Sequence, residues 1–207
     1  MPAKAAKLDL FKTLKQDYVA PRKPVVVKTS PAKYLAIEGL GKPGGEEFQA
    51  CIGALYGVAF TIKMTRKFAG QRDYAVSKLE AQWWADGTND LGRAPMDKWR
   101  WKLLIRTPDF IGQQDLDRAK AVLLKRGKGQ EVMRVQLETI DEGTCVQMLH
   151  VGPYEREGET VAVMRQFAES RHYAFDGRHH EIYLSDPRRV PPERLKTILR
   201  EPVKPAP

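Results

Sequence analysis

The sequence lacks the features that mark several large protein classes. Its two cysteines, Cys51 and Cys145, lie far apart among apolar residues, which favours buried free thiols in a reducing compartment. No run approaches the roughly 18 consecutive apolar residues of a membrane span. The basic N-terminus has no apolar stretch of about 7–15 residues, so it is not a secretory signal. We therefore expect a cytoplasmic protein without a membrane partner.

Recognisable metal, cofactor and nucleic-acid motifs are also missing. His150, His172, His179 and His180 have no metal-ligand spacing, so we expect solvated or hydrogen-bonded histidines. The glycine-rich stretch 39–45 has no Gly-Lys-Ser/Thr ending and is better read as a connection between a strand and a helix. The sequence therefore predicts neither a metal nor a cofactor.

Charge is the most unusual bulk property of the chain. The formal net charge is +9, but lysine and arginine are spread over all 207 residues, and no nucleic-acid-binding motif accompanies them. This distribution favours a role in solubility and does not predict nucleic acid as a partner. An acidic protein partner and the oligomeric state stay open.

The pattern of apolar residues predicts helices and strands in one soluble domain. Residues 8–18 predict a short amphipathic helix outside the main fold, and Glu46 to about Lys67 a long helix with one buried stripe. A third helix, at 113–127, connects two halves. Val132–Leu137 and Thr144–Val151 are predicted to form a hairpin.

The order of elements repeats, and this repeat sets the predicted fold. A strand, a loop with Gly and Pro, an amphipathic helix and two strands occur in both halves, about 23–108 and 131–203. Two βαββ units predict an α+β fold of the SHS2 type, with one antiparallel sheet and both helices on one face. A ligand groove is expected on the opposite face, at the pseudo-two-fold. Residues 1–22 are expected to form an N-terminal extension, 23–203 one domain, and 204–207 a disordered tail.

The stretch from His179 to Pro187 has the length of one strand followed by a turn. In a strand, Ile182 and Leu184 share one face, predicted to be the core, and Glu181 and Tyr183 share the other. The matching strand of the first half presents Glu80 with Trp84 in the same way. A bulge in either strand would invert this assignment.

Several stretches resemble the GyrI-like small-molecule-binding proteins, specifically the stand-alone members of about 200 residues. The resemblance covers about residues 7 to 203, and its longest stretch is HHEIYLSDPRRVPPERLKTILREPV from His179 to Val203. The other matching stretches are DLFKTLK from Asp9, YLAIEGLG from Tyr34, EEFQA from Glu46 into ALY from Ala54, LEAQWW from Leu79, and WRWKLLIR from Trp99 followed by PDFI from Pro108.

The resemblance implies a duplicated βαββ fold with a ligand groove between the halves. The same fold is similar to the effector domains of multidrug-responsive activators, where a buried Glu equivalent to Glu181 receives cationic aromatic compounds. Some stand-alone members resemble this chain and hydrolyse cyclopropane-bearing, DNA-alkylating toxins in an aromatic cage. Only about 20 residues precede the fold, so we do not expect a DNA-binding region there.

These implications define the expected site and function. We expect flat aromatic or cationic xenobiotics as ligands, with hydrolysis of cyclopropane-bearing alkylators as the open enzymatic question. A protein-interaction module of the gyrase-inhibitor type without catalysis is the alternative. Glu181, Glu80 and Tyr183 are the predicted catalytic residues. The predicted ligand-binding residues are Trp84, Trp99, Trp101, Tyr154, Tyr56 and Phe60.

Overall fold

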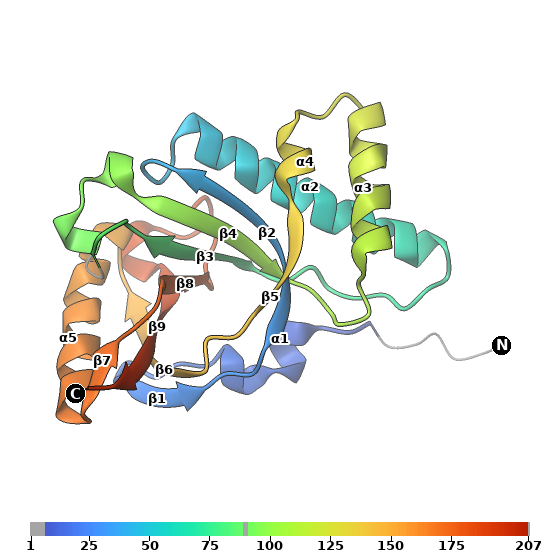
Figure 1. Cartoon of the computed structure of the whole chain (residues 1–207). Helices are drawn as coiled ribbons and strands as arrows, with labels where there is room; N and C mark the ends of the chain where they lie inside the picture. The colour runs from blue at the N-terminus through green and yellow to red at the C-terminus, as the bar shows by residue number, and fades with distance from the viewer. Residues whose placement is uncertain (1–6, 89–90, 207) are drawn as a thin grey trace.

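The computed structural model describes residues 7–88 and 91–206. It consists of one twisted antiparallel sheet with two main helices on a single face (Figure 1). The strands are β1 (Val25–Lys28), β2 (Ala32–Leu40), β3 (Leu79–Trp84), β4 (Arg100–Arg106), β5 (Gln136–Ile140), β6 (Thr144–Val151), β7 (Tyr173–Phe175), β8 (His179–Tyr183) and β9 (Lys196–Pro205). The α-helices are α1 (Leu10–Thr13), α2 (Glu46–Phe68), α3 (Gln113–Lys125), α4 (Glu131–Arg134) and α5 (Glu157–Ser170). Short 3₁₀ turns are η1 (Lys15–Asp17), η2 (Leu91–Arg93), η3 (Met96–Lys98), η4 (Tyr154–Arg156) and η5 (Pro192–Arg194).

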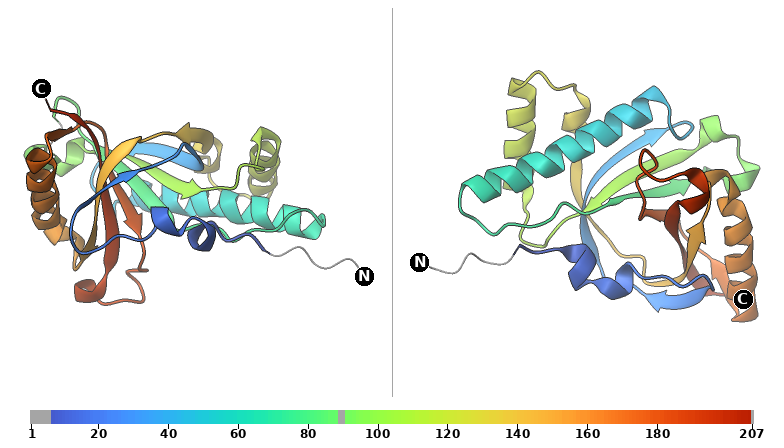
Figure 2. Two further views of the ribbon diagram at one scale, coloured as in Figure 1. Left: turned by 90° about the horizontal axis from the view of Figure 1, so that it is seen from below. Right: turned by 180° about the vertical axis from the view of Figure 1, so that it is seen from behind.

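The duplicated βαββ arrangement is confirmed by the strand order. The sheet runs β1-β6-β9-β8-β3-β4-β2-β5, with β7 on β9, so the β3–β8 pair forms the seam between two similar halves. The first half is β2-α2-β3-β4 and the second is β6-α5-β8-β9. Figure 2 shows α2 running over the first half and α5 beside the second.

The two halves exchange their edge strands. Strand β1 precedes β2 in the chain but pairs with β6 of the second half, and β5 precedes β6 but pairs with β2 of the first. The corners where these segments cross are bonded to each other, because Thr29 donates its backbone N–H to the carbonyl oxygen of Gly143 at 2.8 Å. The predicted hairpin of Val132–Leu137 with Thr144–Val151 is therefore wrong: half of the first segment is helix α4, and β5 pairs with β2.

The main apolar core lies between α2 and the first half of the sheet. The i, i+3, i+4 spacing of α2 buries Cys51, Leu55, Val58 and Ile62 against alternate residues of β2, β3 and β4. Helix α3 occupies the stretch predicted as the connecting helix and packs mainly on α2, with a smaller contact to the edge strand β5. A smaller core joins α5 to β6 and β9 through Met164 and its neighbours. No described helix combines the length and apolarity that a membrane span requires.

The N-terminal segment 7–24 crosses the sheet face that the helices leave bare. The predicted helix of residues 8–18 is broken into α1 and η1, and Tyr18 packs there on Ile182 and Ile198. At the other end of the chain, disorder is wrongly predicted for Lys204 and Pro205. Both belong to β9 and pair with β7; Pro207 lies outside the described residues.

Candidate functional site

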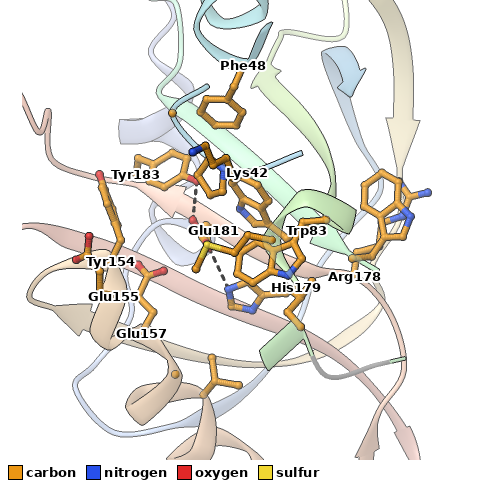
Figure 3. A pocket seen from close by; sticks show the side chains of 18 of the residues that line it. Lys42, Phe48, Trp83, Tyr154, Glu155, Glu157, Arg178, His179, Glu181 and Tyr183 are labelled. Atoms are coloured by element: carbon orange, nitrogen blue, oxygen red, sulfur yellow. Dashed lines mark hydrogen bonds and ion pairs between the residues drawn. The ribbon is translucent and has the colours of Figure 1, made fainter. Parts of the chain in front are cut away.

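A large cavity lies on the helix-bearing face of the sheet, over the seam between β3 and β8 (Figure 3). Its volume is about 1610 Å³, above the roughly 300–1,000 Å³ that is usual for a small-molecule pocket. The expectation of a groove on the opposite face is wrong, because each helix covers only its own half of the sheet. The strip between the helices stays open, while segment 7–24 fills the other face. The aromatic residues that line the cavity are Phe48, Tyr56, Trp83, Trp84, Trp99, Tyr154 and Tyr183.

Alternate residues of β8 form the polar floor of the cavity. His179, Glu181 and Tyr183 point to one face because side chains alternate along a strand, and Glu181 pairs with Ala81, which belongs to the core under α2. The Tyr183 hydroxyl donates to Glu181 Oε2 at 2.6 Å. The other oxygen of this carboxylate, Oε1, lies 3.3 Å from His179 Nε2. One short strand therefore holds a carboxylate between an imidazole and a phenol.

Two further carboxylates complete the floor. Glu201 of β9 lies 2.6 Å from His179 Nδ1 through its Oε1. Glu157 is the first residue of α5, is 7% exposed, and makes no hydrogen bond through Oε1 to any described residue. The start of α5 is fixed by His150, whose Nδ1 is 2.8 Å from Thr160 Oγ1 and whose Nε2 is 3.2 Å from the Pro153 carbonyl oxygen.

Burial and the charges of neighbouring groups shift the pKa values of these residues in different directions. Burial raises the pKa of Glu157 well above its usual value, and the charge of Glu181 raises it further. For Glu181, burial is outweighed by His179 and Tyr183, so its pKa is lowered. For His179, burial is outweighed by Glu201 and Glu181, so its pKa is well raised. Of the two carboxyls, Glu181 is therefore the more readily ionised, and it lies beside an imidazole whose protonated form is favoured.

The aromatic side chains meet in stacked and edge-on pairs around this floor. Phe48 stacks on Trp83 with a centroid distance of 5.6 Å, and Trp99 meets Trp83 edge-on at 6.0 Å. On the opposite side, Tyr154 meets Tyr183 edge-on at 5.8 Å. Flat faces and polarised edges of this kind suit planar aromatic ligands.

Most of the residues predicted for the site do line the cavity. Those that do so are Glu181, Tyr183, Trp84, Trp99, Tyr154 and Tyr56. Trp84 lies at the edge of the cavity, where the guanidinium of Arg178 stacks 3.6 Å from its ring centroid. Trp99 is fixed by its indole N–H, which donates to the Ala94 carbonyl oxygen at 2.9 Å.

Three predicted residues lie elsewhere. Glu80 pairs with Ile182 and therefore faces away from Glu181, so the expectation that both carboxylates share one groove is wrong. Trp101 is completely buried under α2, where its ring lies over Gly39 and meets Phe48 edge-on. Phe60 is half-exposed on α2, outside the cavity.

The sequence prediction missed Glu157, His179, Glu201 and Trp83. Trp83 could have been found, because the alternation that puts Ala81 in the core also puts Trp83 on that face, opposite His179. Glu157 gave no signal, since an acidic residue in the first turn of a helix is common. Its approach to β8 depends on how α5 is placed over the sheet.

A second charged cluster lies on the opposite face, under segment 7–24. His180, completely buried, bridges Glu142 through Nδ1 at 2.8 Å and Glu80 through Nε2 at 3.1 Å. Arg200 donates to Glu142 at 3.0 Å, and Tyr18 donates to Glu80 at 3.2 Å. This cluster fastens the N-terminal segment to the sheet and does not reach the cavity.

Comparison with known proteins agrees with the fold and the cavity. The GyrI-like small molecule binding domain matches residues 106–204. No curated protein matches the chain. An uncharacterized conserved protein from Listeria innocua is 42% identical, with a TM-score of 0.89, and the match covers 96% of this chain and 100% of that one. A hydrolase encoded by lin2189 from Listeria innocua is 40% identical, with a TM-score of 0.87 and the same coverage.

A more distant structure shares only the fold. The EcmrR C-terminal domain is 11% identical, with a TM-score of 0.58, and the match covers 89% of this chain and 98% of that domain. The matched domain, the two full-length relatives and the duplicated βαββ sheet with a cavity at its seam lead to one conclusion. The chain belongs to the GyrI-like family of small-molecule-binding domains.

Proposed function

We propose that the cavity binds flat aromatic small molecules, including cationic ones, and hydrolyses those that carry a strained cyclopropane ring. The observation that carries this proposal is the position of Glu181, a carboxylate on the floor of an aromatic-walled cavity. Trp83, Trp99 and Tyr154 line the same cavity and offer aromatic surface to a ligand bound there.

The walls and the floor serve different parts of such a ligand. Indole and phenol rings replace water on the faces of a planar compound, which supplies the apolar share of binding. A positive charge on the ligand is attracted by Glu181, and the electron-rich ring faces add cation–π attraction.

The same carboxylate can direct water onto an electrophilic carbon. In a cyclopropyl dienone, a water oxygen forms a bond to the unsubstituted ring carbon while the strained C–C bond breaks. The electron pair of that bond moves through the ring to the carbonyl oxygen, which takes up a proton and becomes a phenol. Glu181 accepts the proton that the attacking water loses, as a general base does.

Similarity to a described hydrolase supports the catalytic part of the proposal. The protein encoded by lin2189 is described as a hydrolase and matches this chain over its whole length. Family membership supports the binding part. Fold alone would support neither, because one fold can serve many functions.

Incubation with a cyclopropyl-dienone alkylator, followed by mass spectrometry, tests the proposal. Wild type and the control Glu155→Gln, which changes a carboxylate at the cavity rim, should both form the water adduct over many turnovers. Glu181→Gln should form it at least about 100-fold more slowly, as expected for the loss of a general base. If the compound is recovered unchanged but tightly bound to wild type, the binding part of the proposal holds and the catalytic part is wrong. If the compound is recovered unchanged and unbound, both the binding part and the catalytic part are wrong.

A further inference from the structure

Three potential metal ligands converge on the floor of the cavity from two elements. Glu157 comes from the start of α5, and His179 and Glu181 come from β8. One ligand atom of each residue lies within 4.8 Å of those of the other two. An ion with metal–ligand distances of about 2.0–2.2 Å reaches donors up to about 4.4 Å apart, so small side-chain rotations would bring all three into contact.

We propose that Glu157, His179 and Glu181 bind a divalent transition-metal ion of the Zn²⁺ or Mn²⁺ type. One imidazole nitrogen with two carboxylate oxygens suits these ions, whereas Mg²⁺ and Ca²⁺ prefer oxygen ligands alone. The site opens toward the cavity, so water or a ligand oxygen can complete the coordination of the ion.

The groups behind these ligands are arranged as in known metal sites. Metal-binding histidines usually donate their second ring N–H to a carboxylate, and His179 Nδ1 lies 2.6 Å from Glu201 Oε1. This contact leaves Nε2 directed toward Glu181 Oε1. Tyr183 meanwhile donates to the other oxygen of Glu181, Oε2, and so fixes the orientation of that carboxylate. One nitrogen and one oxygen are thereby presented side by side.

The third ligand, Glu157, gives independent support. Its side chain is more than nine-tenths buried, yet Oε1 makes no hydrogen bond to any residue in the described parts of the chain. Buried carboxylate oxygens without a partner are destabilising, so they call for an explanation. Figure 3 shows Glu157 beside His179 and Glu181, at the foot of the cavity wall that carries Tyr154. A cation at this point would satisfy that oxygen.

The cluster on the opposite face shows what a purely structural group looks like. There His180 also lies between two glutamates, and Glu80 Oε2 and His180 Nε2 likewise make no hydrogen bond within the described chain, but Arg200 neutralises Glu142 and Tyr18 donates to Glu80. No cationic side chain makes a comparable ion pair with Glu157 in the described residues. The two clusters therefore differ in that a guanidinium neutralises a carboxylate of the structural cluster, whereas Glu157 has no such partner in the part of the chain that the structure describes.

This site stands on the geometry of the floor and does not rest on the organic ligand proposed above. The two proposals share Glu181, but only the metal site requires Glu157 and His179 as ligands. Loss of metal binding would leave the aromatic cavity intact, and loss of organic binding would leave the metal ligands in place.

Isothermal titration with Zn²⁺ and with Mn²⁺ tests the proposal directly. Wild type and Glu155→Gln should each bind one ion per chain, whereas Glu157→Gln and Glu181→Gln should lose this binding. Glu201→Gln removes only the group behind His179 and should weaken affinity by about 10–100-fold. With Co²⁺ as the probe, a visible absorption band should form in wild type and be absent from Glu157→Gln.

Each variant is first melted without metal, so that failure to fold is not mistaken for loss of a ligand. Adding Zn²⁺ should raise the melting temperature of wild type and Glu155→Gln, because a ligand that binds the native state stabilises it. It should leave a folded Glu157→Gln unchanged. Absence of saturable binding by wild type, or binding that persists unaltered in Glu157→Gln and Glu181→Gln, would overturn the metal site.

Discussion

His179 and His180 are neighbours in β8, and each bridges two carboxylates, but they do so on opposite faces of the sheet. His179 contacts Glu181 and Glu201 at the floor of the cavity. His180 contacts Glu80 and Glu142 beneath the N-terminal segment. One strand therefore builds the candidate site with one of these residues and anchors the covering segment with the next.

The buried ion pairs of Glu142 with His180 and Arg200 predict that the fold loses stability in acid. Burial is outweighed by these two cations, and the pKa of Glu142 is lowered to about 2 from an ordinary 4.5. Its contribution to the free energy of unfolding is complete above pH 4.5 and is lost as pH falls toward 2. The difference between the pKa values of 4.5 and about 2 corresponds to about 3 kcal/mol.

Denaturant unfolding of wild type and Glu142→Gln over this pH range checks the prediction. The variant should be less stable at neutral pH by several kcal/mol, because His180 and Arg200 lose their shared partner. Its stability should also fall less steeply in acid. Parallel pH curves for the two proteins would contradict the assignment.

Two glycine substitutions should act in opposite directions. A Cβ on Gly39 would lie 2.1 Å from the ring of Trp101, so Gly39→Ala should destabilise the fold by at least about 1–3 kcal/mol. Gly53 lies inside α2 with open space around a Cβ, so Gly53→Ala should stabilise by up to about 1 kcal/mol. Thermal unfolding measures both. A neutral Gly39→Ala would show that Trp101 can move aside.

Removal of single aromatic side chains should show which of them contact a bound ligand. Trp99→Ala should weaken the binding of ethidium, a flat aromatic cation, by about tenfold, which corresponds to roughly 1.4 kcal/mol. Phe60→Ala should leave the affinity unchanged, because Phe60 lies outside the cavity. Fluorescence titration distinguishes the two variants. Equal losses would mean that the ligand binds along α2 and not over β8.

A metal ion and an organic cation should compete for the floor, since both depend on Glu181. Zn²⁺ should displace ethidium from wild type and from Glu155→Gln. In Glu157→Gln, which keeps Glu181 but lacks one metal ligand, Zn²⁺ should no longer displace it. Binding is measured by fluorescence for ethidium and by calorimetry for Zn²⁺. If both ligands bind wild type at the same time, they occupy separate sites.

Local patterns predicted which residues share a strand face, but not which face of the sheet that is. Glu181 and Tyr183 do point together, as the alternation in β8 indicates. Ile182 belongs to a core, yet it is the small core under the N-terminal segment. The assignment of Glu80 failed for the same reason, because pairing between distant strands decides the face.

The sequence also did not indicate which residues along a strand reach the cavity. Trp99 and Trp101 flank one residue and share a face, but Trp99 reaches the cavity while Trp101 packs over Gly39. The duplicated order of elements was readable because it depends on periodicity within short windows. The exchange of the edge strands could not be predicted from such windows, because β5 pairs with β2, which lies about 100 residues earlier in the chain.

The exchange of edge strands has a consequence for how the molecule is held together and how it could have arisen. Each half lacks the strand that closes its own edge and receives it from the other half. A polypeptide cut between the halves would leave two fragments, each with a bare sheet edge that only the other can cover. This is the topology of a strand-swapped homodimer whose two chains have been joined end to end. The cavity at the seam takes the place that the subunit interface would have in such a dimer, so the ligand site lies where two similar units meet.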